Sequence, residues 1–272
     1  MILGADVGGT FTDLVAVEEG RVTTAKVPTT PDQSEGVAAA TMRLRSGGPI
    51  AALLHGTTVA TNALLERDGV RTALVTDEGF EDVLEIGRQD RPSLYDLFDD
   101  RAEPLVARDD RLTPVTISPD RLDGVGAVAV SLVEGHRDPD REGDVVEAVR
   151  AAGFAGPVSL SSRVAPEFRE FERTSTTVLN AYLGPRSAAY LDRLHASLVT
   201  TGLVGSLGVM QSSGGLASID HASAHAASIL LSGPAGGVIA TSRFAVAHGH
   251  RNVVSFDMGG TSTDVCRIDD GV

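Results

Sequence analysis

The sequence contains very few cysteine, lysine and aromatic residues, and each shortage excludes a class of protein. Cys266 is the only cysteine among the 272 residues, which excludes an internal disulfide and a paired-cysteine metal or redox motif. Such a chain suits a reducing compartment, and we predict a cytoplasmic location. Lys26 is the only lysine and follows Ala25 rather than glycine, which excludes a Walker A phosphate loop.

Charge and hydropathy exclude further classes. Asp and Glu number 37 against 23 Lys and Arg, which gives a net charge of −14. Because a surface of this sign repels phosphate backbones and anionic lipids, we expect no nucleic-acid partner and no membrane association. Apolar runs such as residues 127–133 fall short of the ~20 residues of a membrane-spanning helix, and the first residues lack the basic flank of a signal peptide.

The pattern of apolar segments predicts an α/β protein with a mixed sheet. Runs at residues 2–5, 14–17 and 21–27, separated by glycine turns, predict three antiparallel strands. Further strands are predicted at residues 50–54, 72–76, 127–133, 158–161, 207–211 and 252–256, and helices at 32–45, 58–67, 144–152 and 232–247. Residues 87–123 show no persistent period and predict a surface excursion. Residues 168–200 predict a long helix broken near Gly184 and Pro185.

One internal repeat is the most informative feature of the chain. The segment Asp6-Val7-Gly8-Gly9-Thr10-Phe11-Thr12-Asp13 returns as Asp257-Met258-Gly259-Gly260-Thr261-Ser262-Thr263-Asp264, with six of eight positions identical. Each copy follows an apolar strand and leads to an acidic turn that ends in glycine, at residues 18–20 and 269–271. The copies lie 251 residues apart, too far for a solenoid period, so the repeat predicts two lobes that face one another.

Each copy has the chemistry of a phosphate-binding hairpin. Adjacent glycines let the backbone approach an anion closely and adopt a positive φ, so that N–H groups face phosphate oxygens, and threonine hydroxyls add donors. An aspartate at the end of a strand beside this turn is suited to hold Mg²⁺. Glycine turns are also common in ordinary hairpins, but the duplication favours two loops that grip one polyphosphate.

The paired motifs resemble the phosphate hairpins of the actin-like ATPase superfamily, and residues 232–246 resemble its inter-lobe helix. More narrowly, the chain resembles the N-terminal portion of the hydantoinase A/5-oxoprolinase family. The matching stretches are residues 6–13, 55–64, 90–96, 169–178, 211–215 and 231–237. The resemblance implies an α/β, actin-like (ribonuclease H-like) mixed sheet flanked by helices, with a truncated second lobe. It further implies an N-terminal domain over residues 1–181, and over residues 182–272 the start of the core ATPase domain, cut off after the second hairpin.

The resemblance also implies an activity, cofactors and site residues. Members of the family use ATP and Mg²⁺ to open cyclic amides of the hydantoin or 5-oxoproline type, phosphorylating the ring carbonyl oxygen before hydrolysis, and an A-type subunit works with a B-type partner. Asp6 and Asp257 would hold the metal and, with Asp13 and Asp264, form the catalytic set, although the latter two are equally suited to a structural role. The implied nucleotide cradle consists of Gly8, Gly9, Thr10, Thr12, Gly236, Gly259, Gly260 and Thr261.

Two other functions fit the same architecture. Related chains serve ATP-dependent acetone or acetophenone carboxylases, which couple ATP use to bicarbonate instead of a cyclic amide. A chain that keeps the fold without turnover would be a non-catalytic interaction module. Because the sequence stops at Val272, directly after the second acidic turn, we expect no ATP turnover by this chain alone.

The polar segment from His55 to Thr58 lies between a predicted strand and a predicted helix and has two interpretations. Its hydroxyls at a helix N-terminus can contact substrate or phosphate. Alternatively, Thr57 or Thr58 caps the helix and His55 packs in the core. The histidines at positions 221, 225, 248 and 250 lack ligand spacing and are predicted to face solvent, and Cys266 is predicted to pack within a strand.

Overall fold

A computed structural model describes residues 1–30, 32–44, 48–90, 92–93, 95–96, 98–99, 101–258 and 263–271 of the chain. The chain forms two compact units, one of Met1–Asn62 with Ser187–Val272 and one of Ala63–Arg186. Helix α7 (Glu170–Thr200) contributes residues to both units. The predicted domain boundary between residues 181 and 182 stays a prediction.

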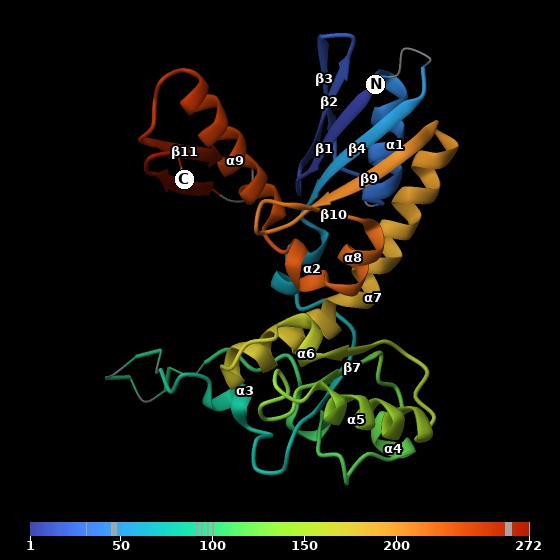
Figure 1. The fold of residues 1–272 in the computed structure, drawn as a ribbon, viewed down its shortest axis with the longest axis vertical. Helices are drawn as coiled ribbons and strands as arrows, with labels where there is room; N and C mark the ends of the chain where they lie inside the picture. Colours follow the sequence, from blue (N-terminus) through green and yellow to red (C-terminus); the bar gives the residue numbers. More distant parts are fainter. Residues whose placement is uncertain are drawn as a thin grey trace. The chain divides into compact units, whose positions relative to one another are not determined.

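The first unit contains a six-stranded mixed sheet in the order β10-β9-β4-β1-β2-β3 (Figure 1). Its strands are β1 (Ile2–Val7), β2 (Phe11–Glu18), β3 (Arg21–Pro28), β4 (Ile50–Thr57), β9 (Leu203–Met210) and β10 (Leu216–Ala217). The first three strands form an antiparallel meander, whereas β4 runs parallel to β1 and β9 runs parallel to β4. The three antiparallel strands predicted from the glycine turns are therefore confirmed.

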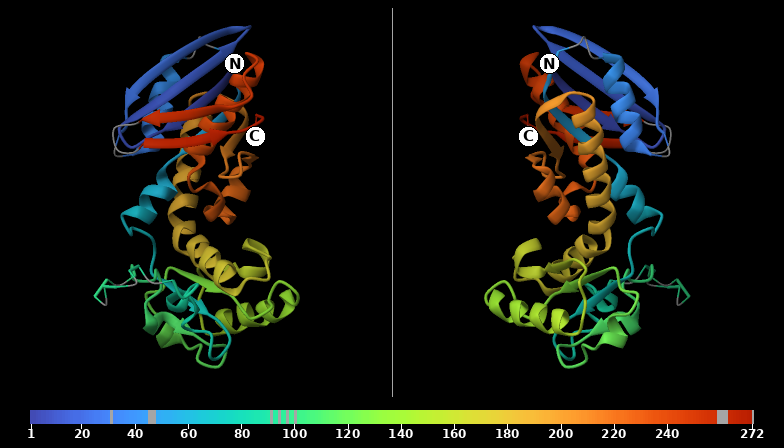
Figure 2. Two further views of the ribbon diagram at one scale, coloured as in Figure 1. Left: turned by 90° about the vertical axis from the view of Figure 1, so that its left-hand side faces the viewer. Right: turned by 90° about the vertical axis from the view of Figure 1, so that its right-hand side faces the viewer.

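Only one face of this sheet is buried along β1. Leu3 and Val7 have no exposed surface, whereas Ile2 and Asp6, which point to the other side, are exposed. Helix α1 (Gln33–Leu44) and the C-terminal part of α7 cover the buried face (Figure 2). We call the side that carries Ile2 and Asp6 the open face.

The remaining elements of the first unit lead to a second hairpin. They are α2 (Val59–Leu65), whose first residues lie in this unit, α8 (Ile219–Ala224), η2 (Ala226–Ile229), α9 (Ser232–Ala247), β11 (Val253–Met258) and β12 (Thr263–Ile268). Strands β11 and β12 form a separate two-stranded antiparallel sheet, and α9 contacts both of them. The predicted small-residue helix and the strand after it are thus confirmed.

The second unit is built on a four-stranded parallel sheet in the order β6-β5-β7-β8. Its elements before α7 are β5 (Thr72–Val75), α3 (Val83–Ile86), η1 (Arg108–Asp110), β6 (Arg111–Leu112), α4 (Pro119–Leu122), β7 (Ala127–Val130), α5 (Pro139–Ala151), β8 (Val158–Leu160) and α6 (Ser161–Val164). Both faces are buried: Val75 packs in one hydrophobic cluster with Val149 of α5, and Leu74 packs in another with Val178 of α7.

Two predictions about the second unit and α7 were wrong. Residues 106–122 are not only a surface excursion, because Val106, Leu112 and Leu122 are buried and β6 joins the sheet edge. Helix α7 is not broken at Pro185. Proline removes one backbone hydrogen bond, at a cost of about 3 kcal/mol, but the fully buried Leu183 and Leu191 on either side favour continuing the helix.

No helix in the described part of the chain is both long enough and apolar enough to cross a membrane.

Candidate functional site

The first copy of the repeat forms the β1–β2 hairpin and the loop between its strands. Asp6 at the end of β1 lies opposite Asp13 of β2. Within the loop, the Gly8 N–H donates to the Phe11 carbonyl at 3.0 Å. A Cβ at Gly8 would lie 3.1 Å from that carbonyl oxygen, so the close backbone approach favours glycine here. Neither Gly8 nor Gly9 adopts a positive φ, so the prediction of positive φ is wrong: the requirement at Gly8 is steric.

A row of residues crosses four neighbouring strands at the level of Asp6. Asp6 pairs with Gly56 of β4 on one side and with Asp13 of β2 on the other, and Asp13 pairs with Lys26 of β3. We call these four residues the Asp6 row. The Lys26 Nζ lies 2.7 and 3.0 Å from the two carboxylate oxygens of Asp13 and 5.0 Å from the centroid of the Phe11 ring. The only lysine of the chain therefore lies on the open face, beside the loop of the repeat.

The Asp6 carboxylate is packed closely between two glycines. A Cβ at Gly56 would lie 3.1 Å from Asp6 Oδ1, and a Cβ at Gly233 would lie 3.5 Å from the same atom. Burial raises the pKa of Asp6 most, the carboxylates of Asp13 and Asp257 raise it further, and the Lys26 ammonium lowers it. Asp257 belongs to the second copy of the repeat, so one carboxylate from each copy acts on the same site.

The start of α9 is anchored beside Asp6. Leu231, the residue before the helix, has a left-handed backbone with φ of 55°, and its N–H donates to the Thr61 hydroxyl at 3.1 Å. The hydroxyl of the buried Ser232 donates to the Thr57 carbonyl at 3.1 Å. These two contacts hold the first turn of α9, with Gly233, against the end of β4 and the first turn of α2. Free N–H groups at a helix N-terminus favour anions.

The second copy of the repeat has the same architecture as the first. Asp257 of β11 lies opposite Asp264 of β12, as Asp6 lies opposite Asp13. The acidic turns also match: Glu19 and Gly20 have φ of 48° and 78°, and Asp270 and Gly271 have φ of 54° and 80°. Positive φ at two successive turn residues is typical of a tight hairpin. The predicted cradle residues Gly259, Gly260 and Thr261 lie outside the described residues.

Two predicted cradle residues have other neighbours in the structure. Thr12 is fully buried, and its hydroxyl lies 3.3 Å from that of Thr29, which donates to the Gly8 carbonyl at 2.9 Å. A Cβ at Gly236 would lie 3.5 Å from the Met210 Cε. Thr12 supports the loop from its buried side, through Thr29. The phosphate contacts predicted for Thr12 and Gly236 stay predictions. The exposed Thr10 accepts from the Thr29 N–H through its carbonyl oxygen at 2.9 Å.

His55 packs in the core, which confirms the interpretation that it is a packing residue rather than a ligand contact. Its side chain is completely buried and its Nε2 lies 2.9 Å from the Tyr190 hydroxyl. Because Gly56 pairs with Asp6, the preceding His55 points to the opposite, helix-covered face of the sheet. Burial lowers the pKa of His55 to about 4, so its ring is neutral at pH 7. Thr57 accepts from the Val59 N–H at 3.2 Å at the start of α2.

The other titratable candidates form no metal site. Within the part of the chain that the structure describes, no group of three or more His, Cys, Asp or Glu side chains is arranged to hold a metal ion. His221 and His225 stack with ring centroids 4.3 Å apart, and Cys266 lies in β12. A magnesium site of two carboxylates completed by phosphate and water oxygens needs no third protein ligand.

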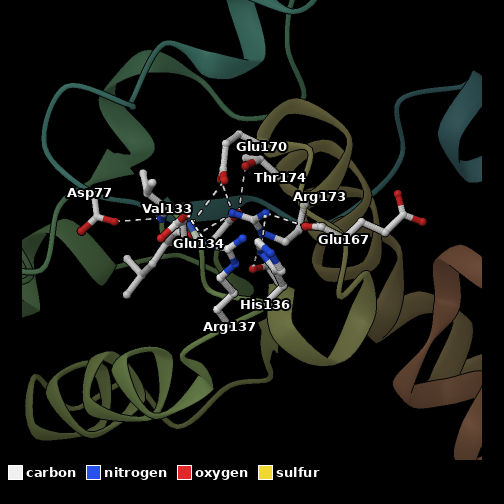
Figure 3. Close-up of polar contacts among 12 residues, drawn as sticks. Asp77, Val133, Glu134, His136, Arg137, Glu167, Glu170, Arg173 and Thr174 are labelled. Carbon is white, nitrogen blue, oxygen red and sulfur yellow. Dashed lines mark hydrogen bonds and ion pairs between the residues drawn. The ribbon is translucent and has the colours of Figure 1, made fainter.

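Sequence reasoning missed a buried arginine in the second unit. Arg173 has no exposed surface and lies beside Glu167 and Glu170 (Figure 3). It donates to the Leu132 carbonyl at 2.8 Å, the Glu167 carbonyl at 2.6 Å and the Ser161 hydroxyl at 3.1 Å. It also forms an ion pair with Glu170. These partners come from the segments after β7 and β8 and from the start of α7. Arg173 therefore links the segments that follow the parallel strands β7 and β8 to α7, which is a structural role.

The fold and the paired hairpins define the class of the protein: an actin-like ATPase-type fold. The chain superimposes on nucleotide-free acetone carboxylase with a TM-score of 0.84, at 25% identity, covering 99% of this chain and 44% of that one. It superimposes on ATP-dependent caprolactamase from Pseudomonas jessenii with a TM-score of 0.82, at 33% identity, covering 98% and 43%.

Sequence comparison then identifies the family. Residues 2–116 match the hydantoinase/oxoprolinase N-terminal region and residues 173–272 match hydantoinase/oxoprolinase. The chain belongs to the hydantoinase/oxoprolinase family, as its motifs predicted. It is 36% identical to the caprolactamase subunit alpha of Pseudomonas jessenii over 97% of this chain and 42% of the relative. It is also 36% identical to 5-oxoprolinase 1 of Arabidopsis thaliana, over 79% of this chain and 20% of the relative. The chain thus spans less than half the length of these relatives.

Proposed function

We propose that this chain is the nucleotide-handling part of an ATP-dependent hydrolase of cyclic amides of the hydantoin or 5-oxoproline type. One observation carries the proposal: the Asp6 carboxylate, held between Gly56 and the start of α9, is subject to the charge of Asp257 from the second copy of the repeat. Two carboxylates that repel one another at one site favour a bound cation. The relatives named 5-oxoprolinase and caprolactamase support a cyclic amide as the substrate class.

The side chains at this site fit a magnesium–nucleotide complex. Mg²⁺ prefers hard oxygen ligands, and Asp6 and Asp257 supply carboxylate oxygens directly or through water. The loop of Gly8, Gly9 and Thr10 offers backbone N–H groups and a hydroxyl to phosphate oxygens. A Cβ would crowd the backbone at Gly8 and the carboxylate at Gly56, so both positions favour glycine.

The second copy of the repeat contributes to the proposed site by analogy with the first. Gly259, Gly260 and Thr261 are the counterparts of Gly8, Gly9 and Thr10. Asp13 and Asp264 each lie opposite a proposed metal ligand across their hairpin. Thr12 and Gly236 complete the proposed cradle, Thr12 by supporting the loop from the buried side.

In the proposed reaction, the chain positions the triphosphate, and the bound cation together with backbone N–H groups would offset its negative charge. ATP supplies the phosphoryl group that activates the ring carbonyl oxygen and makes the amide open to attack by water. Such a transfer depends mainly on positioning and on charge stabilisation. The N-terminus of α9, anchored beside Asp6 by Ser232, adds a partial positive charge on the phosphate side. We assign ring opening to a B-type partner subunit, since the caprolactamase relative is named as one subunit of a larger enzyme.

A second candidate is an ATP-dependent ketone carboxylase. The structural likeness to acetone carboxylase, with a TM-score of 0.84, favours it. The two reactions use the same nucleotide site and differ in the co-substrate. Phosphate release that depends on bicarbonate and a ketone would favour the carboxylase, whereas release that depends on a cyclic amide would favour the hydrolase.

Thermal unfolding with and without MgATP tests the nucleotide site. A ligand at 100 times its Kd stabilises a folded chain by about 2.7 kcal/mol, so MgATP is expected to raise the melting temperature clearly. Asp257→Asn should remove this response. Asp269→Asn is the matched control, because Asp269 lies in the acidic turn that follows the same hairpin and pairs with Arg267. An unchanged MgATP response in Asp257→Asn would contradict the proposal.

The substrate class is tested with the chain assembled with its partner subunit. Oxygen-18 in the ring carbonyl of 5-oxoproline or a hydantoin is expected to appear in the released phosphate, because the carbonyl oxygen receives the phosphoryl group. Unlabelled phosphate would mean that ATP hydrolysis does not activate the ring.

A further inference from the structure

Lys26 is unusual both in its type and in its position. It is the only lysine in a chain whose other cationic side chains are arginines, and it lies in the Asp6 row on the open face. An exposed ion pair such as that of Lys26 with Asp13 contributes at most about 1 kcal/mol to stability. Stability alone is therefore a weak reason for a lysine at this position.

The side chain of Lys26 reaches from its own strand towards the loop of the repeat. Neighbouring strands lie about 4.8 Å apart, and the Lys26 ammonium bridges this spacing to both carboxylate oxygens of Asp13. Its position 5.0 Å from the centroid of the Phe11 ring brings the charge beside the end of the Gly8–Thr10 loop. The charge of Lys26 also acts on Asp6, one strand further across the sheet.

The negative charge of the carboxylates and of a bound triphosphate favours a second cation at the site in addition to the metal. Asp6, Asp13 and Asp257 concentrate negative charge where the proposed site would receive a triphosphate that is itself strongly negative. A metal ion held by Asp6 and Asp257 would neutralise part of this charge. The cationic residue of the Asp6 row is Lys26, which forms an ion pair with Asp13. Its ammonium group lies at the end of a flexible side chain.

We propose that Lys26 binds the terminal phosphate of the nucleotide and that Asp13 is the positioning residue that aims it. This inference rests on the proposed function. When nucleotide is bound, the Lys26 ammonium donates a hydrogen bond to a non-bridging oxygen of that phosphate. A lysine suits this exchange because a point charge leaves one carboxylate easily, whereas arginine forms a bidentate pair with it.

A single lysine allows the contact to be measured without an activity assay. A chain of these 272 residues offers two amines to an amine-selective acetylating reagent, Lys26 and the Met1 amino group, and peptide mass spectrometry separates the two. Met1 is an internal control, because it directly precedes β1, at the end of the strand away from Asp6. Its amino group lies 3.4 Å from the Pro49 carbonyl oxygen.

A non-hydrolysable ATP analogue with Mg²⁺ should slow acetylation of Lys26 several-fold and leave that of Met1 unchanged. MgADP, which lacks the terminal phosphate, should protect Lys26 less. Thermal stabilisation measured on the same samples separates the two proposals. Stabilisation without protection of Lys26 would overturn the role of Lys26 alone, whereas no stabilisation by nucleotide would overturn both.

Matched variants test the same contact by affinity. Lys26→Ala should weaken MgATP binding about tenfold or more, as expected for a lost charge-assisted hydrogen bond, with a smaller effect on MgADP. Lys26→Arg should recover part of the loss, and Asp13→Asn should show an intermediate loss. Arg21→Ala is the control, because it removes the same charge from the other end of β3, where Arg21 pairs with Glu18 in the sheet register. An equal loss in Arg21→Ala, or equal losses for MgATP and MgADP, would overturn the inference.

Discussion

Replacing Asp6 with asparagine is expected to stabilise the chain without nucleotide and to abolish its response to MgATP. Burial and the carboxylates of Asp13 and Asp257 raise the pKa of Asp6 above its ordinary value of 3.8. Ionisation of Asp6 therefore costs folding free energy. This cost is absent well below pH 3.8, develops as the pH rises from 3.8 towards the higher pKa of the folded chain, and is complete above that pKa. Asp6→Asn keeps the shape of the side chain and removes the charge.

The size of the effect follows from the surroundings of Asp6. Asp6 keeps exposed surface although its carboxylate is partly buried. Solvent screening therefore limits the gain to less than about 1 kcal/mol, which corresponds to less than about 4 °C in a chain of this size. Saturating MgATP should stabilise the unmodified chain by about 2.7 kcal/mol at 100 times its Kd. The two effects of the substitution therefore have opposite signs and are separable.

Thermal unfolding of both chains, with and without MgATP, measures these effects at pH 7, and the gain without nucleotide should shrink at acid pH. The control is Asp269→Asn, which breaks an exposed pair with Arg267 and should lower stability by no more than about 1 kcal/mol. Destabilisation of the nucleotide-free chain by Asp6→Asn would refute the repulsion of Asp6 by Asp13 and Asp257. An undiminished response to MgATP would refute the assignment of Asp6 as a metal ligand.

Two further substitutions test buried polar side chains, one in each unit. The buried His55 has a pKa of about 4, below its ordinary value of 6.5, so the free energy of unfolding should be flat above pH 6.5 and fall by about 3 kcal/mol towards pH 4. His55→Gln should flatten this fall in a denaturant titration, and a fall that persists would assign it to another group. Arg173→Met should destabilise the chain by about 3–5 kcal/mol because Glu170 and several carbonyls lose their partner. The exposed Arg137→Ala should change stability by less than about 0.5 kcal/mol, and equal effects would contradict the role of Arg173.

The hairpins of this chain were predictable because their signals are local. Alternating apolar residues and glycine turns specify β1, β2 and β3, and the two-residue turn at Glu19 and Gly20 sets the register of β3 against β2. Counting back from the pair of Glu18 and Arg21 brings Lys26 opposite Asp13, so that contact was also within reach of the sequence.

Other features depend on contacts between distant segments. The close approach of Gly56 and Gly233 to Asp6 depends on the parallel pairing of β4 with β1 and on the docking of α9, which no local pattern specifies. The continuity of α7 through Pro185 depends on burial on both sides of the proline, which outweighs local propensity. Strand β6 has only two residues, too few for a period to be recognised.

The central claim is that both copies of the repeat hold one nucleotide and its metal. Mn²⁺ in place of Mg²⁺ broadens the NMR signals of nearby amides, and the chain can be titrated with Mn²⁺ and ATP together. We predict simultaneous broadening around Asp6 and around Asp257, and its loss in either asparagine variant. Broadening around one hairpin only, with the other unaffected at saturation, would contradict the claim.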